Sequence, residues 1–258
     1  MTGLVLLGGA VAGSAAGAAL HRWPLGATMT NPRRSCCSFC GAGIRPAHLV
    51  PVISWLLLRG RCSECDGRID GRLFILEVLS ACIAVVTVRI YGLTAVSLVL
   101  VVGIVGALLA ALIDHQHLII PDRLTMPLAV WGMIAIPVVA DAERWASVVL
   151  WALGLPAVLH FMNAIAELFS LERPIGGGDI KLLVGVLALS GVSPSGPQIV
   201  MLGTLLLSGI AAGVGVLSGH LGRKSRIPLA PSIAGALLSA ILAPSLAEQA
   251  LHLMSLTT

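Results

Sequence analysis

Three aspartates stand beside apolar segments of the chain, where acidic side chains are rare. Asp114 lies in ALIDHQHLIIPD, Asp122 follows Pro121 in the same segment, and Asp179 follows three glycines in PIGGGDIK. Ionisable groups at the ends of membrane helices are functional candidates. Two carboxylates that meet at a partly dry boundary cannot both ionise easily, so one keeps a proton. Such a pair predicts aspartic-protease chemistry, in which a charged Asp activates water and a protonated Asp donates a hydrogen bond to the scissile carbonyl.

Each aspartate also has a structural interpretation. Asp122 and Asp179 stand at expected helix N-termini, where an Asp side chain accepts backbone N–H groups as a cap. We predict the cap role for Asp122, and it is an alternative for Asp179. Asp114 lies at an expected helix C-terminus, where the helix dipole disfavours a carboxylate. Asp114 is therefore the stronger catalytic candidate, while Gly176–Gly178 would let a substrate backbone approach Asp179 without a side-chain clash.

Two further interpretations of these acids compete with the dyad. Asp114, His115, His117 and Asp122 could supply the nitrogen and oxygen ligands of a catalytic metal ion in a membrane hydrolase, although neighbouring residues in one loop need not converge on one ion. A transporter that couples Asp114 and Asp179 to proton movement is the non-enzymatic alternative. Both acids are expected at one membrane face, whereas transporter sites usually lie near the bilayer midplane.

Four cysteines form two CxxC pairs in the one sizeable polar insertion, residues 21–72. The pairs CSFC and CSEC are separated by 21 residues, and their cysteines are Cys37, Cys40, Cys62 and Cys65. This spacing is typical of a structural four-thiolate zinc site, in which a closed tetrahedral ion folds the loop and does not catalyse. Reduced thiols without metal and a redox dithiol pair are the alternatives. Disulfides are disfavoured because the loop is assigned to the reducing cytosol.

Other residues near these cysteines receive simpler interpretations. Gly41 and Gly67 follow the two pairs, where a tight turn is expected. Cys36 adjoins the first pair, but the two-residue gap favours Cys37 as the ligand. Cys82 lies in an apolar segment, where packing is the simplest role. Glu77, one turn inside the next apolar segment, either pairs with a loop arginine or faces an active cavity.

The composition places all of these residues in a membrane protein. Of the 258 residues, 57% are hydrophobic and 11% are charged, and the mean hydropathy is +0.98. Soluble proteins carry about 25% charged residues, and a chain of this length has too little interior to hide so much apolar surface from water. A soluble globular domain is therefore excluded, and we predict an integral protein of the lipid bilayer.

Apolar runs bounded by charges or by Pro and Gly predict an all-α polytopic membrane protein with about eight transmembrane helices. The expected spans are residues 3–20, 73–91, 94–113, 124–140, 145–163, 180–195, 197–218 and 228–247. Pro194 and Pro197 interrupt the sixth span, which could be short or broken. The expected organisation is a first transmembrane helix (1–20), a cytosolic zinc loop (21–72) and a seven-helix membrane aspartyl peptidase domain (73–258).

The first apolar segment is expected to stay as a helix and not to be removed as a signal peptide. It lacks a basic n-region, and its removal would leave the arginine-rich loop translocated. Gly9, Gly13 and Gly17 recur at four-residue spacing in this segment. This pattern favours close packing against another helix.

The positions of Lys and Arg predict the orientation of the chain. If the N-terminus faces outward, fourteen of the sixteen cations lie on the inner side. These fourteen are Arg22, Arg33, Arg34, Arg45, Arg59, Arg61, Arg68, Arg72, Arg123, Arg173, Lys181, Arg223, Lys224 and Arg226. Only Arg89 and Arg144 then face outward. The net charge of +4 reports this topology and not nucleic-acid binding, and the cysteine loop and all three aspartates are expected on the cytosolic side.

Taken together, the motifs resemble those of the bifunctional type IV prepilin peptidases, the bacterial branch of the GxGD membrane aspartyl proteases. The resemblance covers most of the chain and rests on four segments in family order, NPRRSCCSFCGAGI, PVISWLLLRGRCSECDGRI, IDHQHLIIPD and GGGDIKLL. It implies that Asp114 and Asp179 are the catalytic pair and that the four cysteines of the CxxC pairs bind zinc. It also implies that Asp122 belongs to the motif without being catalytic.

The resemblance also implies substrates and a cofactor. Members of this family cut prepilins and pseudopilins on the cytosolic side of the inner membrane, after a Gly that precedes the apolar helix. They then methylate the new N-terminus with S-adenosylmethionine. Two departures concern this second activity: the family's FLNVVIxR reads AAGAALHR here, and YPxxE reads RLFILE, which keeps only Glu77. No glycine-rich nucleotide fingerprint is visible, so the residues themselves predict no methyl-donor site.

Overall fold

The computed structural model of the chain is built from helices. It describes residues 2–23, 35–172, 175–219 and 227–242. The chain divides into two compact units, Met1–Ser97 and Leu98–Thr258. Within the described residues the extended backbone pairs only as two isolated β-bridges, both in the cysteine loop. The predicted all-α fold is therefore confirmed.

In the first unit, two long antiparallel helices pack along each other, α1 (Thr2–Arg22) and α3 (Gly71–Tyr91). A Cβ atom on Gly9 would lie 2.6 Å from the backbone oxygen of Ser80, and one on Gly13 would lie 2.7 Å from that of Leu76. The two helix backbones thus touch where a side chain would hold them apart. The close packing predicted from the glycine spacing is confirmed.

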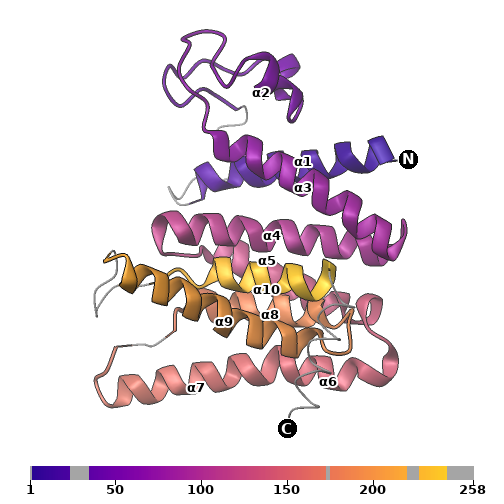
Figure 1. Cartoon of the computed structure of the whole chain (residues 1–258), viewed down its shortest axis with the longest axis vertical. Coiled ribbons are helices and arrows are strands. Elements are labelled where there is room, and N and C mark those ends of the chain that lie inside the picture. The colour runs from indigo at the N-terminus through magenta and orange to yellow at the C-terminus, as the bar shows by residue number, and fades with distance from the viewer. Residues whose placement is uncertain (1, 24–34, 173–174, 220–226, 243–258) are drawn as a thin grey trace. The chain divides into compact units, whose positions relative to one another are not determined.

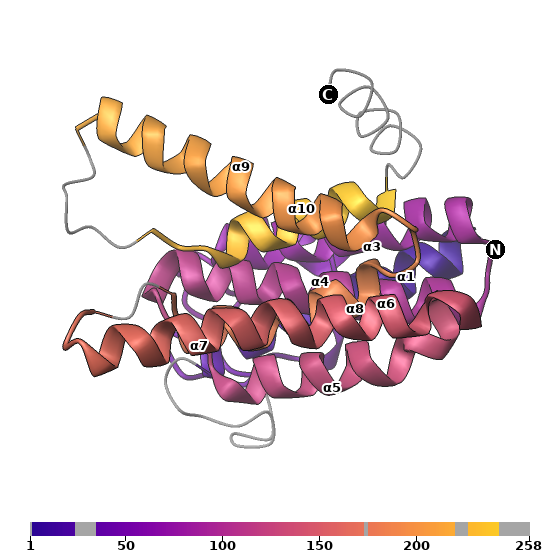
Figure 2. The ribbon, with the colours of Figure 1, turned by 90° about the horizontal axis from the view of Figure 1, so that it is seen from below.

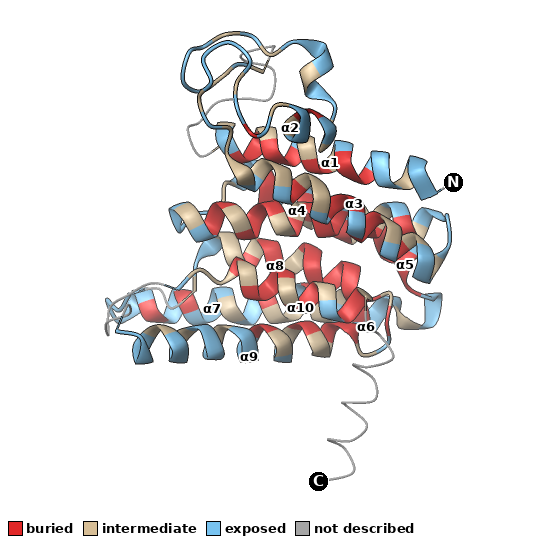
Figure 3. Cartoon of the chain, turned by 45° about the horizontal axis from the view of Figure 1, so that its top comes forward, coloured by how far each residue is buried: buried red, intermediate tan, exposed pale blue. Residues whose placement is uncertain are grey.

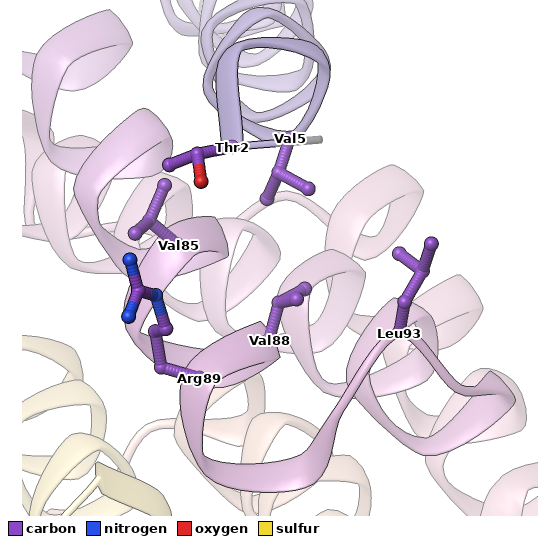
Figure 4. Close-up of a pocket in the computed structure, with 6 residues that line it drawn as sticks. All are labelled: Thr2, Val5, Val85, Val88, Arg89 and Leu93. Carbon is purple, nitrogen blue, oxygen red and sulfur yellow. The ribbon is translucent and has the colours of Figure 1, made fainter.

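The cysteine loop connects these two helices (Figure 1). It contains a short 3₁₀ helix, η1 (Pro46–Leu49), and one helical turn, α2 (Ile53–Leu57). At the other end of the helix pair, residues of α1 and α3 together with Leu93, just after α3, line a partly open pocket of about 180 Å³ (Figure 4). Its lining is apolar except for Thr2 and Arg89. The pocket therefore lies far along the helices from the cysteines.

The second unit contains most of α4 (Ala95–His117) and all the later helices. In chain order these are α5 (Asp122–Val139), η2 (Ala142–Arg144), α6 (Trp145–Val149), the π-helical turn η3 (Leu150–Gly154), α7 (Leu155–Leu168), α8 (Gly177–Ser190), α9 (Gly196–Leu217) and α10 (Ala230–Leu242). Helices α9 and α10 run side by side (Figure 2).

Helix α8 lies at the centre of the second unit. It contacts α5, α6, α7, α9 and α10, and nine of its 14 residues are buried. Much of its ribbon is red in Figure 3, the colour of buried residues. Its closest crossing is with α5, where a Cβ atom on Gly132 would lie 2.5 Å from the backbone oxygen of Gly185. Glycines at both positions let the two backbones touch. The position of α8 is therefore set by contacts from all around it.

Helices occupy all eight segments that the sequence predicts as spans. Six of them are long and apolar enough to cross a membrane: α1, α3, α4, α5, the continuous stretch Ala142–Leu168, and α9. The predicted sixth and eighth spans correspond to α8 and α10, whose described parts have 14 and 13 residues. A span needs about 20 residues. Pro194 and Pro197 lie in the turn after α8 and in the first turn of α9, where prolines interrupt no helix interior.

Candidate active site and candidate metal centre

Asp114 lies in the last turns of α4 and is only 5% exposed. Its Oδ2 accepts a hydrogen bond from the backbone N–H of Ala230, at 3.0 Å. Ala230 is the first residue of α10, and the first N–H groups of a helix have no partner within that helix. The N-terminus of α10 thus stabilises a carboxylate that the C-terminus of α4 disfavours.

Asp179 lies in the first turn of α8, but it does not cap that helix. The N-cap residue is Gly176, with no side-chain cap bond. Asp179 Oδ1 is buried and has no hydrogen-bond partner among the described residues. A Cβ atom on Gly176 would lie 2.7 Å from Asp179 Oδ2, so glycine at this position leaves room for the carboxyl group. The structure therefore does not favour the cap interpretation of Asp179.

The structure brings Asp114 and Asp179 together although 65 positions separate them in the sequence. Their carboxyl groups are close enough to interact electrostatically. Both belong to the second unit, one near the end of α4 and one at the start of α8. Two carboxyl groups that repel each other at a partly buried site do not both ionise easily, so one of them is expected to keep a proton.

Asp122 makes a different contact from the one predicted. Helix α5 starts at Asp122 with Pro121 as its N-cap residue and with no side-chain cap bond, so the predicted cap role is wrong. Its Oδ1 instead accepts a hydrogen bond from Lys181 Nζ, at 2.6 Å. This ion pair joins the first turns of α5 and α8. Because the two side chains are 68% and 40% exposed, the pair contributes at most about 1 kcal/mol.

Sequence reasoning missed Asn163, which lies on α7 and is 5% exposed. Its side-chain amide makes two hydrogen bonds to the backbone of Ile175, directly before the glycine run. The available signal was an amide residue inside the apolar sequence LPAVLHFMNAIAEL. A buried amide in such a segment needs partners of its own, so it marks a specific contact.

The alternative metal site at Asp114, His115 and His117 finds no support in the described part of the chain. There, the only group of three or more His, Cys, Asp or Glu residues that could hold a metal ion is the set of four cysteines. His115 and His117 are exposed at the end of α4. Neighbouring positions on a helix turn point in different directions, which explains why these side chains do not converge.

The four cysteines of the CxxC pairs do converge. The sulfur atoms of Cys37, Cys40, Cys62 and Cys65 all lie within 4.8 Å of one another, and those of Cys37 and Cys65 are 3.8 Å apart. A tetrahedral ion with Zn–S bonds of about 2.3 Å places its ligands about 3.8 Å apart. This cluster can therefore hold a metal ion, and its donor set fits zinc.

Two turns of similar geometry build this cluster. In the first, Cys37 N–H donates to the backbone oxygen of Ala42 at 2.9 Å, and Phe39 N–H lies 3.4 Å from Cys37 Sγ. In the second, Cys62 N–H donates to the backbone oxygen of Gly67 at 2.9 Å, and Glu64 N–H lies 3.5 Å from Cys62 Sγ. Each pair is thus oriented by its own backbone.

The tight turns lie at Gly41 and Asp66. Both have a positive φ, 71° and 59° respectively, and Asp tolerates this conformation better than most residues. The prediction of a tight turn at Gly67 is therefore wrong by one residue. Gly67 instead leaves room for a ring, since a Cβ atom there would lie 3.0 Å from Phe39 Cδ2.

Neighbouring groups shift the pKa values of two of these thiols in opposite directions. The backbone N–H groups of Cys40 and Phe39 lower the pKa of the Cys37 thiol to about 6. The Gly67 N–H lowers the pKa of Cys65, but hydrogen bonding with Cys40, burial and the other thiols raise it to about 12. Thiolates are the form that binds a metal, and a bound cation would displace the remaining protons.

The remaining residues near the cysteines also have defined positions. Cys36 is not one of the clustered ligands, as predicted. Cys82 lies on α3 and is exposed, so its predicted packing role stays a prediction. Glu77 Oε2 accepts a hydrogen bond from the backbone N–H of Val52 at 2.7 Å. Val52 has a φ of 64°, which is strained for a β-branched residue, so the acid on α3 fixes a strained point of the loop.

Two families match the chain, and each match falls within one unit. Residues 7–91 match the bacterial peptidase A24 N-terminal domain, and residues 100–217 match the type IV leader peptidase family. The first match includes the cysteine cluster and the second includes both Asp114 and Asp179. No solved structure matches the chain.

Curated relatives carry the name prepilin leader peptidase/N-methyltransferase. The protein of Bacillus subtilis (strain 168) is 28% identical over 245 residues, which are 94% of each chain. That of Burkholderia pseudomallei (strain 1026b) is 33% identical over 206 residues, 78% of this chain and 64% of the relative. That of Aeromonas hydrophila is 30% identical over 203 residues, 78% of this chain and 68% of the relative.

Proposed function

Because the chain belongs to the type IV leader peptidase family, we propose that it cleaves the leader peptides of type IV prepilins or pseudopilins with Asp114 and Asp179. The observation that carries this proposal is the interacting pair of carboxyl groups in the second unit. One of them is fixed by a backbone N–H and the other has a buried oxygen without a partner among the described residues. No other acid pair is needed for hydrolysis.

The hydrogen bonds suggest a separate role for each aspartate. The Ala230 N–H that Asp114 accepts favours the charged form of this carboxylate. Asp114 takes a proton from water, whose oxygen attacks the carbonyl carbon of the scissile peptide bond. Protonated Asp179 donates a hydrogen bond to the carbonyl oxygen. When the tetrahedral intermediate collapses, the C–N bond breaks and the proton on Asp114 passes to the leaving nitrogen, which becomes the new N-terminus.

The expected position of the two acids at one membrane face fits a substrate whose scissile bond also lies at that face. By the family resemblance, the scissile bond follows a Gly just before an apolar helix. Such a substrate would enter laterally from the bilayer with its helix among the spans, while its positively charged leader stays in the cytosol. Gly177 has no atom within 4 Å of a Cβ built on it, so an extended backbone can approach the first turn of α8.

We assign a second reaction, N-methylation of the new N-terminus with S-adenosylmethionine, to the cysteine loop of the first unit. The support is the match of residues 7–91 to the N-terminal domain of the peptidase family and the names of the relatives. The metal in the cysteine cluster is zinc, because four thiolates in a tetrahedral set suit this ion. With no open position, such an ion folds the loop and supplies no catalytic group.

The topology of the proposed enzyme follows the distribution of cations. An outward N-terminus in the cytoplasmic membrane places the loop and the aspartates on the cytosolic side. The division of the chain into a helix (1–20), a loop (21–72) and a seven-helix domain (73–258) stays a prediction. In the structure, α3 packs against α1 within the first unit.

Mass spectrometry of a synthetic prepilin leader peptide tests the proposal. The peptide is incubated with detergent-purified protein and S-adenosylmethionine, beside Asp114→Asn and Asp179→Asn. We expect cleavage after the leader Gly by the wild type, loss of cleavage in both variants, and an unchanged zinc content. Added mass of one methyl group on the product tests the second reaction separately. Cleavage by both variants would contradict the aspartate assignment.

A further inference from the structure

We propose that Asn163 is a positioning residue for cleavage, because its buried amide holds the segment that places Asp179. Nothing in the motifs of the sequence singles out this residue, and the hydrogen bonds of its side chain among the described residues go to the backbone of Ile175. The inference rests on the proposed function, since leader cleavage is what the placement of Asp179 would control. It concerns how the start of α8 is held and not which groups react.

The contact between Asn163 and Ile175 is a complete backbone clamp. Asn163 Nδ2 donates to the carbonyl oxygen of Ile175 at 2.8 Å, and Asn163 Oδ1 accepts from the N–H of Ile175 at 3.3 Å. One amide side chain therefore satisfies both polar groups of one residue, as a neighbouring strand would. Because Asn163 is 5% exposed, water cannot readily replace these bonds.

The clamped residue leads directly to the acid. Gly176, the next residue, is the N-cap of α8, and its carbonyl accepts from Ile180 N–H at 3.2 Å. A Cβ atom on Gly176 would lie only 2.7 Å from Asp179 Oδ2. The backbone that Asn163 fixes thus passes directly beside the carboxyl group. A shift of Ile175 would therefore move the backbone of Gly176 that lies beside Asp179.

Asp179 depends on this backbone because its side chain is weakly fixed. Its Oδ1 has no hydrogen-bond partner among the described residues, and α8 has no side-chain cap at its start. The Lys181–Asp122 ion pair also ties the first turn, but its side chains are 40% and 68% exposed. Exposed pairs of this kind hold a position weakly. The buried clamp is therefore the stronger tie.

Kinetics of leader cleavage test this role in the full-length protein. Asn163→Leu keeps the number and branching of the side-chain heavy atoms, though not their volume, and removes both hydrogen bonds. Asn163→Asp keeps an acceptor for the Ile175 N–H and replaces the donor by an oxygen that faces the Ile175 carbonyl oxygen. Ser190→Ala is the matched control: it removes one buried hydrogen bond, Ser190 Oγ to the Leu187 oxygen, at the other end of α8. Size-exclusion profile and zinc content report folding in each variant.

We expect Asn163→Leu to lower kcat for leader cleavage about 100-fold, the effect of a displacement of about 1 Å at a catalytic group. KM should stay within about twofold, because the clamp does not contact the substrate. Methylation of an already mature pilin peptide and the zinc content should be unchanged. Asn163→Asp should also lower kcat, because its oxygen cannot donate to the Ile175 carbonyl oxygen, and Ser190→Ala should keep the wild-type rate.

The outcomes separate this inference from the proposed function. A wild type that cuts no leader peptide overturns both. An active wild type with a fully active Asn163→Leu overturns the inference alone, as does an equal loss in Ser190→Ala. If Asn163→Leu does not fold, a folded Asn163→Asp decides: reduced kcat with unchanged KM supports the clamp, and a wild-type kcat contradicts it.

Discussion

The cysteine site and the aspartate site are assembled over very different distances along the chain. Each CxxC turn orients two sulfurs through hydrogen bonds within about six residues, as between Cys37 and Ala42. Asp114 is instead held by Ala230, 116 positions away, and Asp179 by a helix that five other helices surround. The metal site should therefore tolerate changes outside its loop, whereas the acid pair should respond to changes throughout the second unit.

The largest effect is expected from loss of one metal ligand. Cys62→Ser leaves three sulfurs for a tetrahedral site, so the chain should lose its zinc and the loop its fold. Cys36→Ser is the matched control, because Cys36 adjoins the first pair but is not a clustered ligand. Metal analysis and limited trypsin digestion of the loop measure the outcome. Zinc retained by Cys62→Ser, or lost from Cys36→Ser, would contradict the assignment of the ligands.

Substitution of a glycine outside the site should lower the activity of the acid pair and leave metal binding unchanged. Any side chain at Gly185 meets the backbone oxygen of Leu128 at the crossing of α5 and α8. Gly185→Val should therefore destabilise the protein by about 1–3 kcal/mol and lower the rate of leader cleavage, while zinc content stays unchanged. The measurements are a thermal unfolding midpoint and a cleavage rate.

Gly209→Ala provides the control for that substitution. Gly209 lies on α9 with no atom within 4 Å of a Cβ built on it, so the substitution should change stability by about 1 kcal/mol at most. Equal losses in Gly185→Val and Gly209→Ala would show that the crossing has no special role. Loss of zinc from Gly185→Val would show that the two sites are not independent.

A smaller effect is expected where α3 anchors the loop. Glu77→Leu leaves the N–H of Val52 without its acceptor, at a cost of about 1–3 kcal/mol to local stability. Hydrogen exchange of residues 50–60 should therefore speed up. Glu64→Gln serves as the control, because Glu64 pairs with Arg45 at an exposed position of the same loop. Exchange that is unchanged in Glu77→Leu would contradict an anchoring role.

The smallest effect is expected at Asp122. Its partner in the structure is Lys181, and the pair is largely exposed. Asp122→Asn should lower stability by about 1 kcal/mol at most and keep the cleavage rate within about threefold of the wild type. The leader-peptide assay measures this rate. An inactive but folded Asp122→Asn would place Asp122 in the catalytic machinery and contradict the proposed pair.

The distance along the chain between the residues that build each site also explains which features the sequence could predict. The span positions and the convergence of the CxxC pairs depend on short patterns, and the structure places helices and sulfurs accordingly. The hydrogen bond from Ala230 to Asp114 and the clamp at Asn163 join distant segments. No local pattern specifies such a pairing. The turn at Asp66 was missed because two neighbouring residues, Asp and Gly, can both adopt a positive φ.

The most direct test of the central claim is a double-mutant cycle on Asp114 and Asp179. Cleavage of the leader peptide is measured for Asp114→Asn, Asp179→Asn and the double variant, with zinc content as the check of folding. When two catalytic groups act as one unit, removal of either group abolishes nearly all of the enzyme's activity. We therefore predict that each single variant is slowed by about 10⁴-fold or more and that the double variant is no slower. Effects that multiply in the double variant, or a single variant that keeps wild-type activity, would contradict the dyad.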